Sequence, residues 1–146
     1  MDYSKLALEL IKKMYLLHRA TPQKSIDEAM QGEAYVLHFI AERGSNVMPG
    51  EIGGAMNVSS ARVAQTLNNI ESKGLIVRQT DVNDRRRVLV SLTPEGRSAA
   101  EKHQQNLLSL VTEMLKLLGE RDAREYVRIT GKLADAISKN DNEESL

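Results

Sequence analysis

Three consecutive arginines, Arg85 to Arg87, occur in the segment DVNDRRR, between two short stretches rich in β-branched residues. Guanidinium groups are permanently charged and donate several hydrogen bonds, so they can pair with phosphate oxygens or with guanine edges. An arginine-rich loop is equally compatible with a plain solvated surface. The sequence around the loop distinguishes between these two interpretations.

The helix expected just before this segment has an unusual outer face. Val63, Leu67 and Ile70 recur at helical spacing and are expected to face a core. The side chains left on the outer face are Ser60, Arg62, Gln65, Asn68 and Asn69. A solvated helix would more often carry Lys and Glu there, whereas Arg pairs with guanine, and Asn or Gln with adenine, in the major groove of DNA. This inventory favours contact with base edges.

The charge of the chain is neutral overall but uneven along its length. Twenty basic residues balance twenty acidic ones. Between Val58 and Thr93, however, the basic residues outnumber the acids Glu71, Asp81 and Asp84. The basic residues of this stretch are Arg62, Lys73, Arg78, Arg85, Arg86 and Arg87. The neutral total therefore hides a basic lobe, which is the local signature of a surface that meets phosphates.

Hydrophobic periodicity and the positions of proline and glycine predict the helices and strands that position these residues. A chain of 146 residues can form one core-bearing domain, alone or with an oligomerisation arm. Helical patterns cover residues 6–18, ending near Pro22, and then 32–43, 48–56, 61–73, 94–118 and 120–138. Two strands are expected over 75–80 and 88–93, joined as an antiparallel hairpin. The predicted fold is mainly α with a small β-hairpin, and contains a helix-turn-helix.

The stretch 59–96 resembles the recognition helix and wing of the multiple-antibiotic-resistance regulator (MarR) family of winged helix-turn-helix transcription factors. The segments that carry the resemblance are KGLIVR at 73–78, DRR at 84–86 and LTPEG at 92–96, in the order and spacing of the family. The resemblance implies a winged helix-turn-helix lobe with N- and C-terminal dimerisation helices. It also implies a homodimeric repressor that binds double-stranded DNA at a pseudo-palindromic operator.

The domain organisation expected from this resemblance has three parts. Residues 1–30 and 98–139 are expected to form a helical dimerisation region, and residues 31–97 the DNA-binding lobe. The acidic residues 140–146 are expected to be a disordered tail. The apolar stripes at both ends are long for one small core, although they could also simply cover the winged helix of a single monomer.

The resemblance assigns distinct roles to the residues of the hairpin loop. Arg86 is the candidate for insertion into the minor groove, where narrow A·T-rich stretches concentrate negative potential. Arg85 and Arg87 are expected to touch phosphates. Asp84 could hold a guanidinium in its inserting rotamer, or merely offset local repulsion.

The start of the recognition helix and the short helix before it carry two further expectations. Ser59 and Ser60 could place hydroxyl and backbone N–H groups on a phosphate, and Ser59 could also be an ordinary N-cap. Met48 stands where the family usually has Thr or Ser, and Ile52 and Gly53 where it has a Leu-Ala pair. The short helix is therefore expected to lack a side-chain cap and to be loosened by glycine.

Other classes of protein find little support in the sequence. The chain has no cysteine, which excludes disulfides, thiolate metal sites and thiol oxidation. Its histidines, His18, His38 and His103, are far apart, and no catalytic motif accompanies them. No enzyme activity, cofactor or metal is expected. The alternative function is a helical protein-interaction module without sequence-specific DNA binding, which would need neither the amide-bearing face nor the arginine loop.

The same resemblance implies a pocket for a small aromatic acid between the DNA-binding lobe and the dimer helices. Tyr15, His18 and His38 are the candidates to line it, although residue type alone favours core packing for them. The first residues mix charges into their apolar stretch, unlike a signal peptide, and no apolar run approaches the roughly 20 residues of a membrane span. A cytoplasmic location without membrane contact is expected.

Overall fold

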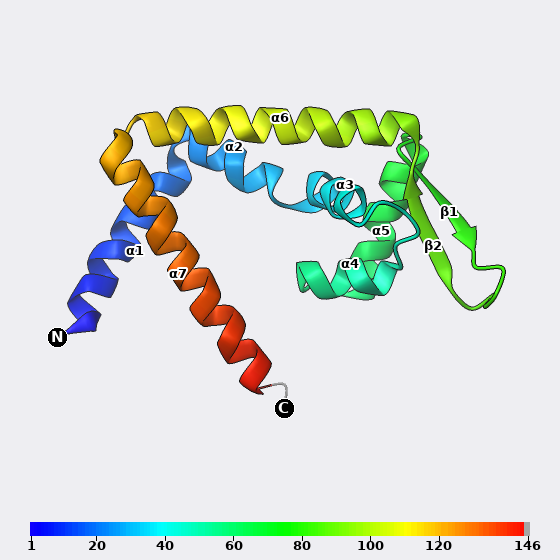
Figure 1. Cartoon of the computed structure of the whole chain (residues 1–146), viewed down its shortest axis with the longest axis horizontal. Coiled ribbons are helices and arrows are strands. Elements are labelled where there is room, and N and C mark those ends of the chain that lie inside the picture. The colour runs from blue at the N-terminus through cyan, green and yellow to red at the C-terminus, as the bar shows by residue number, and fades with distance from the viewer. Residues whose placement is uncertain (145–146) are drawn as a thin grey trace. The chain divides into compact units, whose positions relative to one another are not determined.

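The structure, a computed structural model, describes residues 1–144, which form seven helices and one two-stranded hairpin (Figure 1). Two compact units divide the chain, with the boundary between Leu108 and Ser109 inside the sixth helix. The predicted fold class, mainly α with a small hairpin in a winged helix-turn-helix lobe, is confirmed. The elements are α1 (Tyr3–Arg19), α2 (Thr21–Ala29), α3 (Gly32–Arg43), α4 (Pro49–Met56), α5 (Ser60–Ser72), β1 (Ile76–Thr80), β2 (Val88–Leu92), α6 (Pro94–Lys116) and α7 (Glu120–Glu144).

One hydrophobic core holds the helix-turn-helix and the hairpin together. The predicted inward residues of α5, Val63, Leu67 and Ile70, are all buried, and Ile52 of α4 and Val90 of β2 are completely buried. The core also includes Val36, Leu37, Ile40, Val47, Ile76 and Ala100. Because α3, α4, α5 and both strands each contribute to this cluster, the outer face of α5 has a fixed orientation relative to the hairpin.

The turn between α4 and α5 depends on Asn57. This residue adopts the left-handed conformation, with φ 54°, which Asn tolerates better than most residues with a Cβ. Its amide N–H donates to the Gly53 carbonyl and ends α4. At the other end of α4, Met48 supplies no hydroxyl cap, but its backbone N–H donates to Glu51 Oε2 at 2.8 Å. The loss of a Thr or Ser cap is therefore partly compensated from within the helix.

The hairpin pairs Ile76 with Leu92 and Thr80 with Val88 in antiparallel register, as predicted. A third short segment joins its edge, because the backbones of Val47 and Val90 exchange two hydrogen bonds of 2.9 and 2.8 Å. This bridge was not predicted, because a single paired residue produces no alternating pattern in the sequence. The bridge anchors β2 to the segment between α3 and α4.

The LTPEG segment forms the junction between α5, the hairpin and α6. Thr93 Oγ1 donates to the Gly74 carbonyl at 2.6 Å and accepts from the Gly96 N–H at 3.0 Å, while the Thr93 N–H donates to the Leu75 carbonyl at 3.0 Å. Gly74 ends α5 with φ 75°, a conformation that glycine adopts without strain. A Cβ on Gly96 would lie 1.8 Å from the Leu75 carbonyl oxygen. The junction therefore requires glycine at position 96.

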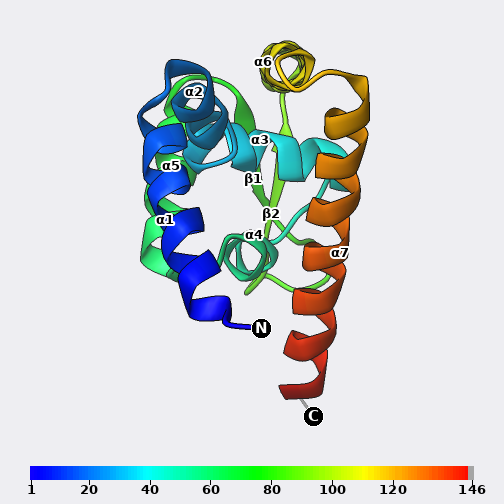
Figure 2. The same cartoon turned by 90° about the vertical axis from the view of Figure 1, so that its left-hand side faces the viewer.

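The structure shows an additional helix, α2, that was not predicted, because Pro22 lies in the first turn of a new helix instead of only ending the first one. Figure 2 shows α1 and α2 as successive helices joined at a bend, and their residues pack against each other. No residue of α1, and none of the described residues of α7, is buried.

The end of α7 differs from the prediction. The helix was expected to end near Ser138, with a disordered tail over 140–146, but it continues through Glu144. Residues 145 and 146 lie outside the described part of the chain. The acidic segment NDNEE lacks glycine and proline, so nothing in it interrupts the backbone hydrogen bonds of α7.

A pair of glycine substitutions tests the junction. Gly96→Ala should lower the free energy of unfolding by about 3 kcal/mol, because the new methyl group collides with the Leu75 backbone carbonyl, which accepts the hydrogen bond from Thr93. Gly54→Ala is the matched control, since nothing lies within 4 Å of that position and alanine favours helix by about 1 kcal/mol. Urea unfolding at equal protein concentration measures both. Equal midpoints for the two variants would contradict the close approach.

Candidate nucleic-acid interface

The N-terminus of α5 is capped as expected. Ser59 Oγ accepts from the Arg62 backbone N–H at 3.2 Å, so the predicted ordinary cap is present. Ser60, the first residue of the helix, is exposed. The remaining free N–H groups of the first turn give this end a partial positive charge, which suits an approaching phosphate.

The outer face of α5 presents polar groups to solvent. Arg62, Gln65, Asn68 and Asn69 are all exposed, as the helical spacing predicted. Among the described residues, neither the Arg62 guanidinium nor the Gln65 carboxamide has a hydrogen-bond partner. These two groups are therefore available to a ligand at no cost in internal bonds.

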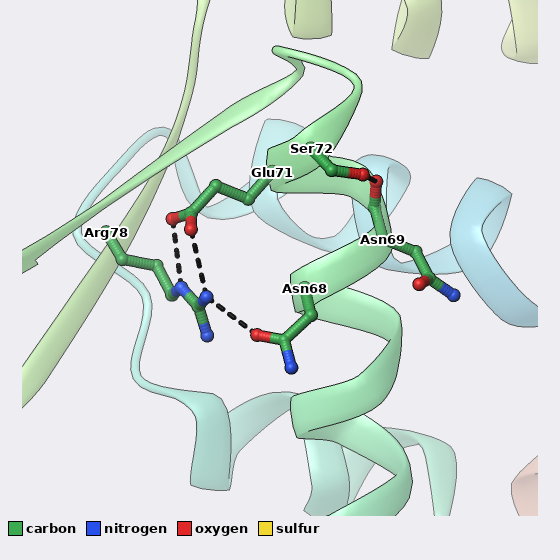
Figure 3. A network of polar contacts seen from close by, with 5 residues as sticks. All are labelled: Asn68, Asn69, Glu71, Ser72 and Arg78. Carbon is green, nitrogen blue, oxygen red and sulfur yellow. Dashed lines mark hydrogen bonds and ion pairs between the residues drawn. The ribbon is translucent and has the colours of Figure 1, made fainter.

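Asn68 belongs to a network that the sequence did not reveal. Arg78, on β1, donates from Nε to Glu71 Oε2 and from Nη2 to Glu71 Oε1, both at 2.9 Å (Figure 3). Its Nη2 also donates to Asn68 Oδ1 at 2.7 Å. The hydrogen bond from Arg78 holds the pKa of the Glu71 carboxyl below its ordinary value, and the pKa of Arg78 is raised in return. Arg78 and Glu71 are seven positions apart, and they meet because β1 packs back against α5 after the turn at Gly74.

The wing, defined here as β1, the loop 81–87 and β2, is shaped by its two aspartates. The Asp81 side chain accepts from the Asn83 N–H at 2.9 Å, and the Asp84 side chain accepts from the Arg86 N–H at 3.1 Å. The loop closes where the Asp81 N–H donates to the Arg87 carbonyl at 2.9 Å. Both acids therefore build turns, in which aspartate commonly bonds to the backbone two residues later.

Asp84 also reaches the side chain of Arg86. The distance from Arg86 Nε to Asp84 Oδ1 is 3.3 Å, while the Arg86 side chain remains 92% exposed. Of the two roles considered for Asp84, holding a guanidinium therefore agrees with a direct contact. An exposed pair of this kind contributes little stability, so Arg86 can leave it easily.

The neighbouring arginines differ in their environment. Arg87 donates from Nε and Nη2 to the sulfur of Met48, at 3.2 and 3.0 Å, which connects the wing to the start of α4. Arg85 is exposed, and its guanidinium has no partner in the part of the chain that the structure describes. The contact of Arg87 with Met48 was not predicted, because the two residues are 39 positions apart.

The three residues expected to line an effector pocket are not brought together. A cavity of about 410 Å³ contains His38 in its wall, but neither Tyr15 nor His18. His18 lies 3.2 Å from Asp27 of α2 through Nδ1, and Tyr15 is exposed on α1. The residues lining the cavity are His38, Ala41, Glu42, Arg97, Ala100, Glu101, Gln104 and Gln105.

Within residues 1–144, no group of three or more His, Asp or Glu side chains is arranged to hold a metal ion. None of the described helices combines the length and the apolar character needed to cross a bilayer.

Comparisons with known proteins agree with this geometry. The model of the MarR family matches residues 29–87, which run from the end of α2 to the end of the wing loop. Two relatives from Bacillus subtilis are 29% identical to this chain. The HTH-type transcriptional regulator YwhA matches over 142 residues, 92% of this chain and 99% of its own length. The HTH-type transcriptional repressor MdtR matches over 111 residues, 76% of this chain and 71% of its own.

Solved structures share the fold over nearly the whole chain. YusO from Bacillus subtilis is 26% identical, with a TM-score of 0.71 over 93% of this chain and 99% of its own. A variant of MepR from Staphylococcus aureus, bound to an oligodeoxyribonucleotide, is 20% identical, with a TM-score of 0.55 over 94% of this chain and 99% of its own.

A capped helix with arginine and amide side chains on its outer face lies beside a hairpin with arginines in its loop, which is the form of a winged-helix DNA-binding protein. The relatives that match the chain are named transcriptional regulators, so the protein is a transcriptional regulator of this class. The protein is similar to the MarR family in sequence over residues 29–87 and in fold over nearly the whole chain. The predicted resemblance is thereby confirmed. The individual contacts with DNA remain predictions.

The Arg78–Glu71 pair gives a prediction of pH dependence. Because the pKa of Glu71 is lowered from 4.5, its carboxylate should still be ionised somewhat below that pH in the folded protein. The stabilisation from the pair is present above the unfolded pKa and is lost as the pH falls through the lower, folded pKa. In Arg78→Ala, carboxyl NMR titration should show the pKa of Glu71 moving up towards its ordinary value.

Glu125 is the internal control for this titration. Its pKa is also lowered, by a hydrogen bond from Arg128, which the substitution does not touch. An unchanged pKa of Glu71 in Arg78→Ala would show that the pair does not form in solution.

Proposed function

We propose that the chain is a homodimeric transcriptional repressor that reads a pseudo-palindromic operator with α5 in the major groove and the wing in the minor groove. The observation that carries this proposal is the contact between Arg78 of β1 and Asn68 of α5. This contact joins the base of the wing to the outer face of α5, so that both present their polar groups to one ligand. A DNA duplex offers a major and a minor groove side by side.

The dimensions of DNA support the assignment of the two readers. The major groove is about 12 Å wide and admits a helix, whereas the minor groove is about 6 Å wide and admits an extended side chain. Ser60, Arg62, Gln65 and the two asparagines would face base edges or phosphates in the major groove. Arg86 has the exposure that insertion into the minor groove requires.

The roles proposed for the other wing residues follow from their contacts. Arg85 is free to meet a phosphate. Arg87 would do so while it remains in contact with Met48, so its position is set by α4. Asp84 would restrict the conformations of the Arg86 side chain in the free protein, and the minor groove would take the place of Asp84 as its partner when DNA binds. Ser59, already engaged as a cap, would contribute mainly through the backbone at the helix start.

The proposed dimer is supported by the apolar residues that the terminal helices expose. Leu10 and Leu17 of α1 are more than half exposed, as are Ile129, Leu133 and Ile137 of α7. Leaving such stripes in water is unfavourable by about 25 cal/mol for each Å² of apolar surface. A second copy of the chain would cover them and would place two copies of α5 about one DNA turn, roughly 34 Å, apart. Residues 1–30 and 98–139 stay the proposed dimerisation region.

Repression and release by a ligand are the remaining parts of the proposal. MdtR is named a repressor, and a MepR variant is bound to an oligodeoxyribonucleotide in its solved structure, which supports the same kind of action here. A bound dimer that covers a promoter excludes polymerase. The cavity beside His38 contains Arg97, whose guanidinium suits the carboxylate of a small aromatic acid. Such a ligand would release the operator.

A charge placed on α7 tests the dimer. Leu133→Glu should convert the dimer to a monomer at micromolar concentration, because the carboxylate would have to be buried without a partner. Lys139→Glu is the control, since it puts the same residue on a different face of the helix and should leave the dimer intact. Sedimentation equilibrium measures both. A wild-type chain that is a stable folded monomer at this concentration would refute the proposed assembly.

Operator titration tests the DNA-binding proposal. After selection of preferred sequences from random duplexes, wild type, Arg86→Ala and Arg86→Lys are titrated against operators with A·T-rich or G·C-rich flanks. Arg86→Ala should weaken binding most on the A·T-rich flanks, and Lys should restore it only in part, because ammonium holds its water more tightly than guanidinium. Log affinity should fall with log salt by about 0.9 per neutralised phosphate.

The other outcomes of this titration have distinct meanings. Equal losses on both flanks would make Arg86 a phosphate contact. No binding preference in the wild type, together with no effect of Arg86→Ala, would favour the protein-interaction module instead. Repeating the wild-type titration with small aromatic acids tests whether a ligand of that class weakens operator binding.

A further inference from the structure

The carboxamide of Asn68 is polarised by its contact with Arg78. An arginine side chain has only donors, so the atom that faces its Nη2 at 2.7 Å has to be the amide oxygen of Asn68. The amide nitrogen is then directed away from the guanidinium, as Figure 3 shows. The group that Asn68 offers to a ligand is therefore a hydrogen-bond donor.

Arg78 is itself held firmly enough to impose this orientation. Two parallel hydrogen bonds of 2.9 Å attach it to Glu71, one turn along α5 from Asn68. Its side chain is only 30% exposed. Bidentate pairs of this kind fix the plane of the guanidinium as well as its distance. Rotating the Asn68 carboxamide would place its NH2 group against the Arg78 donors, which is unfavourable.

The other amides on the same face have no such constraint. Asn69 points away from Arg78 in Figure 3, and the hydroxyl of Ser72 contacts its backbone carbonyl, not its carboxamide. Among the described residues, the Gln65 carboxamide has no hydrogen-bond partner either. These side chains can turn to present either their donor or their acceptor, whereas Asn68 presents the donor.

The polarity of the amide decides which base it can recognise. Adenine is read by an amide that accepts from N6 and donates to N7 at the same time, which needs both ends of the carboxamide at one edge. Guanine presents two acceptors, N7 and O6, to the major groove, and both can accept from a single NH2 group. A carboxamide with its oxygen turned to the protein matches guanine better than adenine.

We propose that Arg78 is a positioning residue for DNA recognition: it fixes Asn68 as a donor, and Asn68 thereby selects guanine at one position of each operator half-site. This inference rests on the proposed function, in which the outer face of α5 lies in the major groove. It replaces the simpler expectation that an asparagine on this face reads adenine.

The experiment measures base preference in the selected operator. The position read by Asn68 is the one at which Asn68→Ala abolishes the preference. At that position the wild type should favour guanine over adenine by about tenfold. Asn68→Asp keeps the oxygen that accepts from Arg78 but replaces the donor by an acceptor, so the preference should move to cytosine, whose N4 donates.

Arg78→Lys tests the positioning role at constant charge. Lysine cannot bond Glu71 and Asn68 in the same bidentate geometry, so the carboxamide is freed to turn. The preference for guanine should fall to about twofold as adenine becomes acceptable. In an Asn68→Ala background, Arg78→Lys should have no further effect on base preference. Thermal unfolding confirms that each variant is folded.

Several results would overturn the proposal. A wild-type preference for adenine at the Asn68 position would mean that the amide reads with both ends. No change of preference in Asn68→Ala at any position would remove Asn68 as a reader and leave the proposed function standing. A change of preference from Arg78→Lys in the Asn68→Ala background would show that Arg78 acts independently. A wild type without any base preference would refute the proposed function, and this inference with it.

Discussion

The close approach of Gly96 to the Leu75 carbonyl is the constraint on which the reading surface depends. The end of α5, the start of β1 and the start of α6 meet at this point. Thr93 joins them through hydrogen bonds to Gly74, Leu75 and Gly96. The wing leaves and returns at the same junction. Its direction relative to α5 is therefore set by backbone contacts that leave no room for a side chain at position 96.

A second set of contacts transmits this geometry to the exposed polar residues. Arg78 connects the wing to the outer face of α5, Arg87 connects it to Met48 at the start of α4, and Asp84 bonds to the tip of the loop. These bonds are exposed or half-exposed, so each adds little to stability. Their effect is to limit the directions in which charged and amide groups point, which reduces the entropy lost when a ligand binds.

Much of this arrangement was accessible from residue patterns. The inward residues of α5, the Ser59 cap, the hairpin and the long helix after Pro94 all follow from local rules of periodicity, capping and β-propensity. The three segments that resemble the MarR family give its fold because they encode the junction and the wing. Two local predictions were wrong or incomplete: Pro22 begins the helix α2, and the acidic residues after Ser138 extend α7. Pro22 fits the first turn of a helix, and the segment after Ser138 contains no glycine or proline to interrupt one.

What the sequence determined by itself is the set of elements and the chemistry of the exposed face, because both depend on neighbours within a few positions along the chain. Tertiary structure alone decided which of those polar groups are free. The packing of β1 against α5 brings Arg78 to Glu71 and Asn68, and the bridge of Val47 with Val90 accompanies the contact of Arg87 with Met48. Such pairings join residues whose separation along the chain carries no signal, since they arise only when the core closes and brings distant backbone segments into register.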